Sequence, residues 1–302
     1  MKSSLKSIII LVLILVVNSC ENKSKTLLES WSVGTSSGLF TEFSQKEFDE
    51  FKSNGIDCLE LNSGILQEKS DQERELWCND FKEKADKADL KVWSVHLPYS
   101  RMLDLSVTDE ETRNNMIHEC VKIISLCKRL KPDKYIIHPS SEPIEDSIRT
   151  ARIENSIASL KILNEEVKKQ NAQLVVECLP RTCLGNTSEE LLQIVNSVGN
   201  GIGVCFDSNH LLKEKPEEFV AKTGHLITTV HISDYDGLDE KHWLPGKGVI
   251  NWTNVVSELV KSDYQGPFMF EVSARNNPGV TTKDLVSSWQ QIKSNYYKTI
   301  IR

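Results

Sequence analysis

Four side chains that bind metals or move protons each stand near the end of a short apolar run. Glu177, Asp207, His231 and Glu271 all directly follow a valine or a phenylalanine. A carboxylate that ends a buried strand is costly to desolvate unless a positive charge compensates it. No lysine or arginine stands at the neighbouring strand ends, and divalent cations bind such mixed oxygen and nitrogen donors. The four residues predict one site for Mn, Mg, Co or Zn, with a purely structural polar cluster as the alternative.

The apolar runs that carry these residues alternate with amphipathic stretches. The runs span residues 31–34, 56–62, 91–97, 134–138, 173–179, 202–207, 226–232 and 267–272. They are short and rich in Val, Ile and Phe, which is typical of parallel strands buried on both faces. The helix-like segments between them include 44–54, 109–130, 144–170 and 253–262. Strand–helix units without a domain linker predict an α/β fold, a single-domain (β/α)8 TIM barrel over residues 30–302.

Active-site residues of such a barrel come from the C-terminal ends of the strands, and further polar side chains stand there. They are Glu60, His96, His138, His210, His242 and Lys247. The first three end strands, His210 follows the sixth strand, and the last two lie in the loop after the seventh. We expect these six residues to contact a substrate or to support the residues that do.

Five fragments, taken in order along the chain, resemble one known family. They are Val175–Glu177, Gly203–His210, Val230–Asp234, Leu244–Gly248 and Phe268–Glu271. In these fragments the chain is similar to the xylose-isomerase-like superfamily, the sugar isomerase and epimerase barrels that include the endonuclease IV branch. The resemblance covers nearly everything after residue 29. It implies that the four strand-end residues named first are the metal ligands, and that a small carbohydrate is the substrate.

The reaction implied by this resemblance is proton transfer next to a carbonyl. Glu177 and Glu271 would flank opposite faces of the substrate, one removing a proton to leave an enediolate and the other returning it. Return on the opposite face is epimerisation, and return on the neighbouring carbon is isomerisation. Loss of a β-substituent would make the enzyme a lyase or dehydratase of a keto-sugar or keto-glycoside. Cys183 and Gly237 stand where ketose 3-epimerases carry a glutamate and an arginine, which weighs against simple ketose 3-epimerisation.

Two other classes of protein stay open at this point. An endonuclease IV-like multi-zinc hydrolase would recruit the additional histidines, with Glu240 two residues before His242. A non-catalytic sugar-binding lipoprotein would use aromatic side chains as a platform for a sugar ring. The aromatic candidates are Trp31, Trp93, Tyr99 and Trp243. The presence of all four expected metal ligands favours the enzyme over the binding protein.

The N-terminal residues indicate export rather than fold. Lys2 and Lys6 precede an apolar run over residues 8–17, which is too short to form a stable membrane anchor. Val17–Cys20 resembles the bacterial lipobox, in which the cysteine is acylated. We expect residues 1–19 to be a lipoprotein signal peptide and residues 20–29 to be the lipidated Cys20 and a tether, with a plain secretory signal as the alternative. The body would then sit in the bacterial cell envelope, outside the cytoplasm, with the lipid as its only membrane contact.

The net charge of the expected mature body bears on which partners it could bind. Lys2 and Lys6 belong to the expected leader, so 34 of the 36 basic residues remain against 43 acidic ones, a net charge of −9. An acidic body without a basic or aromatic stripe argues against nucleic acid as a partner.

Of the eight cysteines, seven follow Cys20 without any Cys-x-x-Cys pair. We expect most of them to be small buried side chains, with at most one disulfide.

Overall fold

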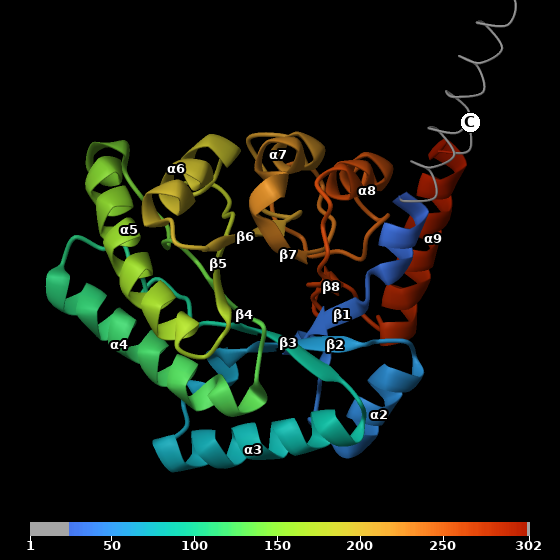
Figure 1. Cartoon of the computed structure of the whole chain (residues 1–302), viewed down its shortest axis with the longest axis horizontal. Helices are drawn as coiled ribbons and strands as arrows, with labels where there is room; N and C mark the ends of the chain where they lie inside the picture. Colours follow the sequence, from blue (N-terminus) through green and yellow to red (C-terminus); the bar gives the residue numbers. More distant parts are fainter. Residues whose placement is uncertain (1–23, 301–302) are drawn as a thin grey trace, which may run out of the picture.

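A barrel of eight parallel strands, ringed by helices, forms the body of the protein in a computed structural model that describes residues 24–300 (Figure 1). The strands are β1 (Val33–Ser36), β2 (Cys58–Asn62), β3 (Lys91–His96), β4 (Lys134–Ile137), β5 (Gln173–Glu177), β6 (Gly203–Asp207), β7 (Ile227–His231) and β8 (Phe268–Phe270). Residues 24–30 form a short helix before β1. The single (β/α)8 barrel predicted from the sequence is confirmed.

The helices follow the strands one by one and cover the outside of the barrel. They are α2 (Gln45–Ser53), α3 (Asp71–Lys87), α4 (Glu110–Cys127), α5 (Asp146–Lys168), α6 (Ser188–Val198), α7 (Pro216–Thr223), α8 (Trp252–Lys261) and α9 (Thr282–Ile300). Their starts are encoded locally. Ser44 and Glu47 form a reciprocal capping box at α2, and Thr187 caps α6 by accepting a hydrogen bond from the Glu190 amide.

Neighbouring strands pair in the order β7-β6-β5-β4-β3-β2-β1-β8. The ring closes between β7 and β8, where the Ile232 amide donates to the Met269 carbonyl at 2.8 Å and the Glu271 amide to the Ile232 carbonyl at 3.1 Å. The β2–β3 register shifts between Leu59 and Glu60. Closure brings the carboxyl ends of all eight strands to one rim of the barrel.

Most of the apolar core lies between the strands and the helices. Trp31, just before β1, stacks on Trp289 of α9 with ring centroids 5.9 Å apart, and Trp289 stacks on Phe268 of β8 at 4.1 Å. All three rings are buried. This stack ties the last helix to the strands that close the barrel. Buried aromatic side chains of this size contribute strongly to core stability.

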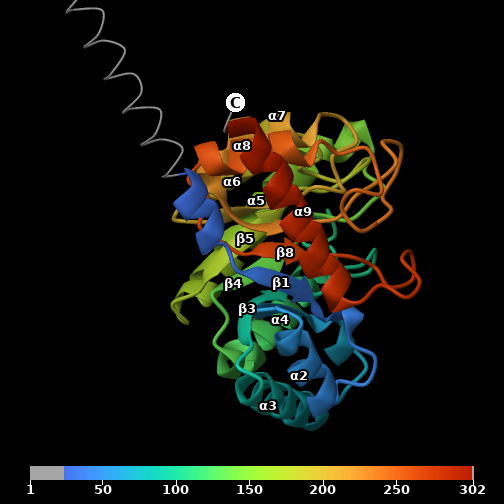
Figure 2. The ribbon, with the colours of Figure 1, turned by 90° about the vertical axis from the view of Figure 1, so that its right-hand side faces the viewer.

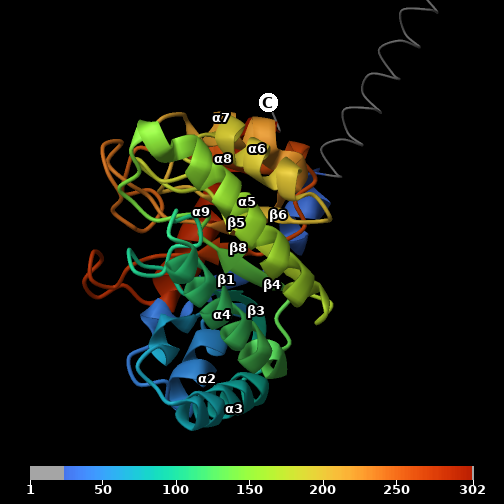
Figure 3. The same cartoon turned by 90° about the vertical axis from the view of Figure 1, so that its left-hand side faces the viewer.

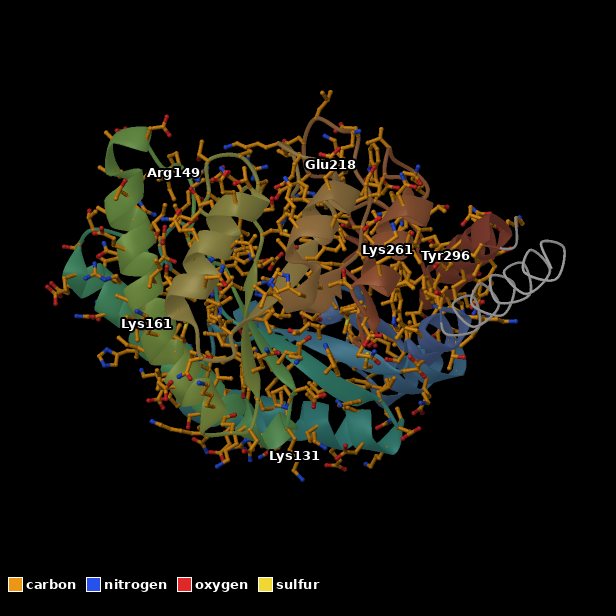
Figure 4. The ribbon with its side chains drawn as sticks, turned by 45° about the horizontal axis from the view of Figure 1, so that its top comes forward. Lys131, Arg149, Lys161, Glu218, Lys261 and Tyr296 are labelled. Carbon is orange, nitrogen blue, oxygen red and sulfur yellow. The ribbon has the colours of Figure 1, made fainter. Side chains whose placement is uncertain are left out.

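The loops that follow the strands gather at one end of the barrel. Two opposite side views show the loops after β7 and β8, in orange and red, projecting from the same end (Figures 2 and 3). Charged side chains such as Lys131, Lys161 and Glu218 lie at the periphery of the molecule (Figure 4). The rim formed by the carboxyl ends of the strands therefore lies beneath these loops.

The expected strand limits need small corrections. The first strand runs over Val33–Ser36 rather than 31–34, because Trp31 is a core residue that precedes the ladder. The last strand covers only Phe268–Phe270, so Glu271 follows it. The seven cysteines of the described part are buried, as expected, and none of them forms a disulfide. No helix within residues 24–300 is long and apolar enough to cross a membrane. The expected signal peptide and Cys20 lie outside the described residues.

Candidate metal centre and substrate cavity

Strand alternation turns the candidate ligands into the barrel. Ile136, Val175 and Cys205 form a small buried cluster of their own, while their chain neighbours join the large core under the helices. Side chains two residues apart share one face of a strand. The small cluster therefore occupies the barrel interior, and Glu177 and Asp207, each two residues further along, share that interior face at the rim.

The four predicted ligands meet at this rim. One donor atom from each of Glu177, Asp207, His231 and Glu271 lies within 4.8 Å of all the others. Two oxygens of the group, Asp207 Oδ2 and Glu271 Oε2, are buried without a hydrogen-bond partner. Buried carboxylate oxygens are normally satisfied, and a divalent cation among these four donors would satisfy both. The donor set thus fits one divalent metal with mixed oxygen and nitrogen ligands.

The pKa values of the carboxyl groups at the rim also fit a bound cation. Burial, together with the charges of nearby carboxylates, raises the pKa of Asp207 to about 6 and that of Glu271 to about 7. Burial also raises the pKa of Glu177, but the charges and hydrogen bonds of His231 and His138 outweigh it and hold that pKa well below its usual range. Two crowded carboxyl groups resist ionisation, and a bound cation would remove that resistance.

Glu177 lies at the centre of a ring of imidazoles. Its Oε2 is 2.9 Å from His96 Nε2 and 3.2 Å from His138 Nε2. Its Oε1 is 3.2 Å from His231 Nδ1 and 3.3 Å from His210 Nδ1. Burial lowers the pKa of His138 to about 4, so this imidazole is neutral near pH 7.

Glu60 contacts the Nε2 side of the His231 ring, away from the other candidate ligands. Its Nε2 lies 3.0 Å from Glu60 Oε1, and Ser94 Oγ donates to Glu60 Oε2 at 2.6 Å. The Nδ1 atom therefore faces the other ligands, 3.4 Å from Glu271 Oε2. Carboxylates that orient a ligating histidine in this way strengthen metal sites.

A second group of donors lies beside the first. Atoms of His210, Glu240 and His242 lie within 4.8 Å of one another, with His210 Nε2 3.0 Å from Glu240 Oε1. Arg181, in the loop after β5, contacts Glu240 at 2.9 Å, Asp239 at 2.7 Å and Glu142 at 2.9 Å. A third group, His96 with Glu177 and His231, shares two residues with the four-ligand set.

A cavity of about 340 Å³ opens above these groups. It is lined by Glu177 and Glu271, by His138, His210 and His242 of the predicted substrate contacts, and by Tyr99, Arg181, Glu240 and Cys183 among others. Cys183, which the sequence comparison singled out, is part of the cavity wall.

Three of the six predicted substrate contacts do not reach this cavity wall. Glu60 and His96 are each 1% exposed and lie behind His231 and Glu177. Lys247 is exposed on the loop after β7 and is not among the lining residues. Glu60 lies inside β2 and His96 ends β3, and both contact candidate ligands from below the rim, whereas the loop after β7 carries Lys247 outward.

Of the four aromatic candidates, only Tyr99 lines the cavity. Its ring stacks on that of His138 with centroids 4.2 Å apart. Trp31 is in the core stack, and Trp93 lies under Lys91 and Lys134 at the other end of the strands. Core packing explains these two rings.

The sequence interpretation missed Arg181. It lies four residues beyond Glu177 and has a positive φ of 51°, so a loop conformation that ordinary residues rarely adopt turns it to the rim. The available signal was its place in a loop after a strand that ends in a candidate ligand. Arg181 forms ion pairs with three carboxylates outside the four-ligand set. It is therefore not available to neutralise the carboxylates of that set, as a cation would.

Comparisons with known proteins agree with this geometry. The family model described as xylose isomerase-like TIM barrel matches residues 48–292. An uncharacterized protein of Methanocaldococcus jannaschii is 27% identical over 207 residues, 66% of this chain and 70% of that protein. The probable endonuclease 4 of Persephonella marina is 27% identical over 173 residues, 54% of this chain and 58% of that protein. The match thus spans little more than half of that endonuclease.

Solved structures share the same architecture. A D-tagatose 3-epimerase-like protein superposes with a TM-score of 0.73 at 23% identity, covering 89% of this chain and 98% of that one. The 3-keto-D-glucoside 4-epimerase of E. coli gives 0.69 at 17% identity, with 87% and 99% covered. At these identities the likeness establishes the fold. The extent of the family match settles the membership: the chain belongs to the xylose isomerase-like TIM barrel family.

Proposed function

We propose that this protein is a divalent-metal-dependent isomerase or epimerase of a carbohydrate. One observation carries the proposal. Donor atoms of Glu177, Asp207, His231 and Glu271 converge, the two glutamates line the cavity, and two of the carboxylate oxygens are buried without a partner. Solved structures of the same fold include a D-tagatose 3-epimerase-like protein and a 3-keto-D-glucoside 4-epimerase, which supports a carbohydrate substrate.

The two glutamates that line the cavity suit proton transfer. Glu177 ends β5 and Glu271 follows β8, so β6 and β7 separate them along the rim. A substrate between them would meet one carboxylate on each side. When bound, a divalent metal supplies Lewis acidity toward a carbonyl and its neighbouring hydroxyl. One glutamate would then take the proton and the other return it, while His138, His210 and His242 would hold substrate hydroxyls.

The proposal is tested by metal content and by hydrogen exchange. We expect about one Mn, Co, Mg or Zn per purified chain, and metal-dependent uptake of deuterium from D₂O into a member of a panel of ketoses and keto-glycosides. Glu177→Gln should abolish the uptake, with Lys261→Ala, an exposed change on α8, as the control. Release of a β-substituent would identify a lyase or dehydratase. A metal-free protein whose sugar binding is unaffected by Glu177→Gln would refute the enzymatic proposal and favour a binding protein.

A multi-zinc hydrolase is the second candidate function. The observation that favours it is the group of His210, Glu240 and His242 beside the four-ligand set, with His96 and His138 on Glu177. A probable endonuclease 4 is among the similar proteins, although the acidic surface of this chain disfavours DNA as the substrate. About three zinc ions per chain, and phosphodiester hydrolysis without deuterium exchange, would support this function instead.

We also propose that the mature protein is anchored to the bacterial cell envelope through a lipid on Cys20. Support comes from the charged start, the short apolar run and the cysteine that follows it. Cys20→Ser should move the protein from the membrane fraction to the soluble exported fraction and should abolish labelling by a radioactive fatty acid. Labelling of the variant equal to that of the wild type would contradict the proposal.

A further inference from the structure

A second cavity adjoins the one above the candidate ligands. It measures about 360 Å³ and shares Tyr99, His242 and Glu271 with the first cavity, which measures about 340 Å³. Each cavity alone is at the lower end of the usual range for small-molecule sites. Because they share three wall residues, the two cavities are neighbours at the rim, and we treat them as two lobes of one cleft.

The two lobes of this cleft lie over opposite halves of the barrel rim. The first, the β4–β6 lobe, is walled by residues that follow these strands, such as Ser140, Arg181 and His210. The second, the β8–β2 lobe, is walled by Asn62 at the end of β2 and by Ala274 and Arg275 in the loop after β8. In the closed strand order these sets are separated by β3 on one side and β7 on the other.

Two of the three shared residues stand at those boundaries. Tyr99 follows β3 and His242 follows β7. Tyr99 is 40% exposed although its ring stacks on His138, and Asn62 Nδ2 lies 3.5 Å from its hydroxyl. A ligand that occupies both lobes would pass Tyr99, His242 and Glu271, because these residues line both cavities.

The chemistry of the lobes differs. The β4–β6 lobe carries the carboxylates of Glu142, Glu177, Glu240 and Glu271. The β8–β2 lobe has only Glu271 of these, and offers serines, Asn62 and Arg275. Within residues 24–300 the Arg275 side chain has no ion-pair or hydrogen-bond partner, and it is exposed. Neutral hydrogen-bonding groups with one free guanidinium suit a hydroxyl-rich ligand unit.

We propose that the β8–β2 lobe is a second sugar subsite, so that the preferred substrate is a glycosylated keto-sugar of two units rather than a monosaccharide. The reacting unit would lie between Glu177 and Glu271, and the second unit would lie over the loop after β8. This inference rests on the proposed function, and it adds that the substrate has two sugar units.

The test compares matched probes on the purified, manganese-loaded protein. D-Fructose and its galactosyl and glucosyl derivatives lactulose and turanose differ by one sugar unit. We expect calorimetry to give an affinity at least about tenfold higher for a glycosyl-fructose than for fructose. Ala274→Trp, which fills the second lobe from an exposed loop, should remove this preference and leave fructose binding unchanged. Ala274→Ser should keep it, and Arg275→Ala should weaken only the two-unit probe, by about three- to tenfold.

Equal affinities for fructose and for both glycosyl-fructoses would overturn the inference, as would failure of every two-unit probe to bind. A preference that survives Ala274→Trp would also overturn it. These outcomes are distinct from failure of the proposed function, which would appear as absent metal or absent deuterium uptake. A preference abolished by Ala274→Trp in a protein without exchange activity would support the subsite and refute the isomerase.

Discussion

Asp207→Asn gives a sharp test of the carboxylate crowding at the candidate metal centre. Asp207 Oδ1 accepts a hydrogen bond from the Asn209 amide at 2.6 Å, while Oδ2 is buried without a partner. The asparagine retains the acceptor and places an NH₂ group where the unpartnered oxygen was. That group can donate to a neighbouring carboxylate, such as Glu271 with its own unpartnered oxygen. The variant should therefore remove the repulsion between carboxylates in the metal-free site, and it should also lose the ability to bind the metal.

The magnitude follows from the raised pKa values. That of Asp207 rises from 3.8 to about 6 and that of Glu271 from 4.5 to about 7. Both folded-state pKa values exceed the unfolded ones, so the stability these groups contribute is fully present below about pH 4. It is lost as the pH rises through 6 and 7. Each shift corresponds to about 3 kcal/mol, and because the groups raise each other's pKa the joint loss by pH 8 is about 3 to 6 kcal/mol.

The assay is thermal and denaturant unfolding of metal-free protein between pH 5 and 8. The wild type should lose stability across this window, by about 5 to 10 °C in melting temperature, and Mn²⁺ should restore it at pH 8. Metal-free Asp207→Asn should be more stable than the metal-free wild type at pH 8 by about 2 to 3 kcal/mol, and should not respond to Mn²⁺.

Asp234→Asn is the matched control. Asp234 is equally buried, but its oxygens accept hydrogen bonds from the Gly246 and Ile250 amides and from Trp252 Nε1. Its loss should destabilise the protein at every pH. A wild type whose metal-free stability does not fall between pH 5 and 8, or an Asp207→Asn variant less stable than wild type at pH 8, would refute the reasoning.

Three further predictions address the second layer of the site, the proton transfer and the core. Glu60→Gln should weaken metal binding about 10- to 100-fold, because His231 loses the carboxylate that orients it, as a competitive chelator titration would measure; unchanged affinity would contradict that role. Glu271→Gln should lower the deuterium exchange rate at least about 100-fold at saturating Mn²⁺, and a rate within threefold of wild type would exclude it from proton transfer. Trp289→Ala should cost about 3 to 5 kcal/mol in denaturant unfolding, whereas exposed Lys261→Ala should change stability by less than about 0.5 kcal/mol.

The barrel and the convergence of its four candidate ligands could be predicted because both depend on local pattern. Apolar runs separated by amphipathic stretches specify parallel strands covered by helices. In a closed barrel all strand ends meet at one rim. Glu177, Asp207 and His231 end their strands, so their convergence follows from the topology together with the alternation of side chains along each strand. The buried cysteines likewise follow from their apolar surroundings.

What only the tertiary structure decided is which side chains surround those ligands and how far the cavity extends. Glu60 and Lys247 look alike in the sequence as polar residues near strand ends, yet Glu60 lies behind His231 and Lys247 is exposed away from the cavity wall. Arg181 reaches the rim through a loop conformation that no periodic pattern encodes. Alternation determines which face of a strand a residue occupies, whereas the direction of a loop side chain depends on contacts between segments far apart in the chain. The two-lobed cleft arises from such contacts, and so it could be found only in the folded molecule.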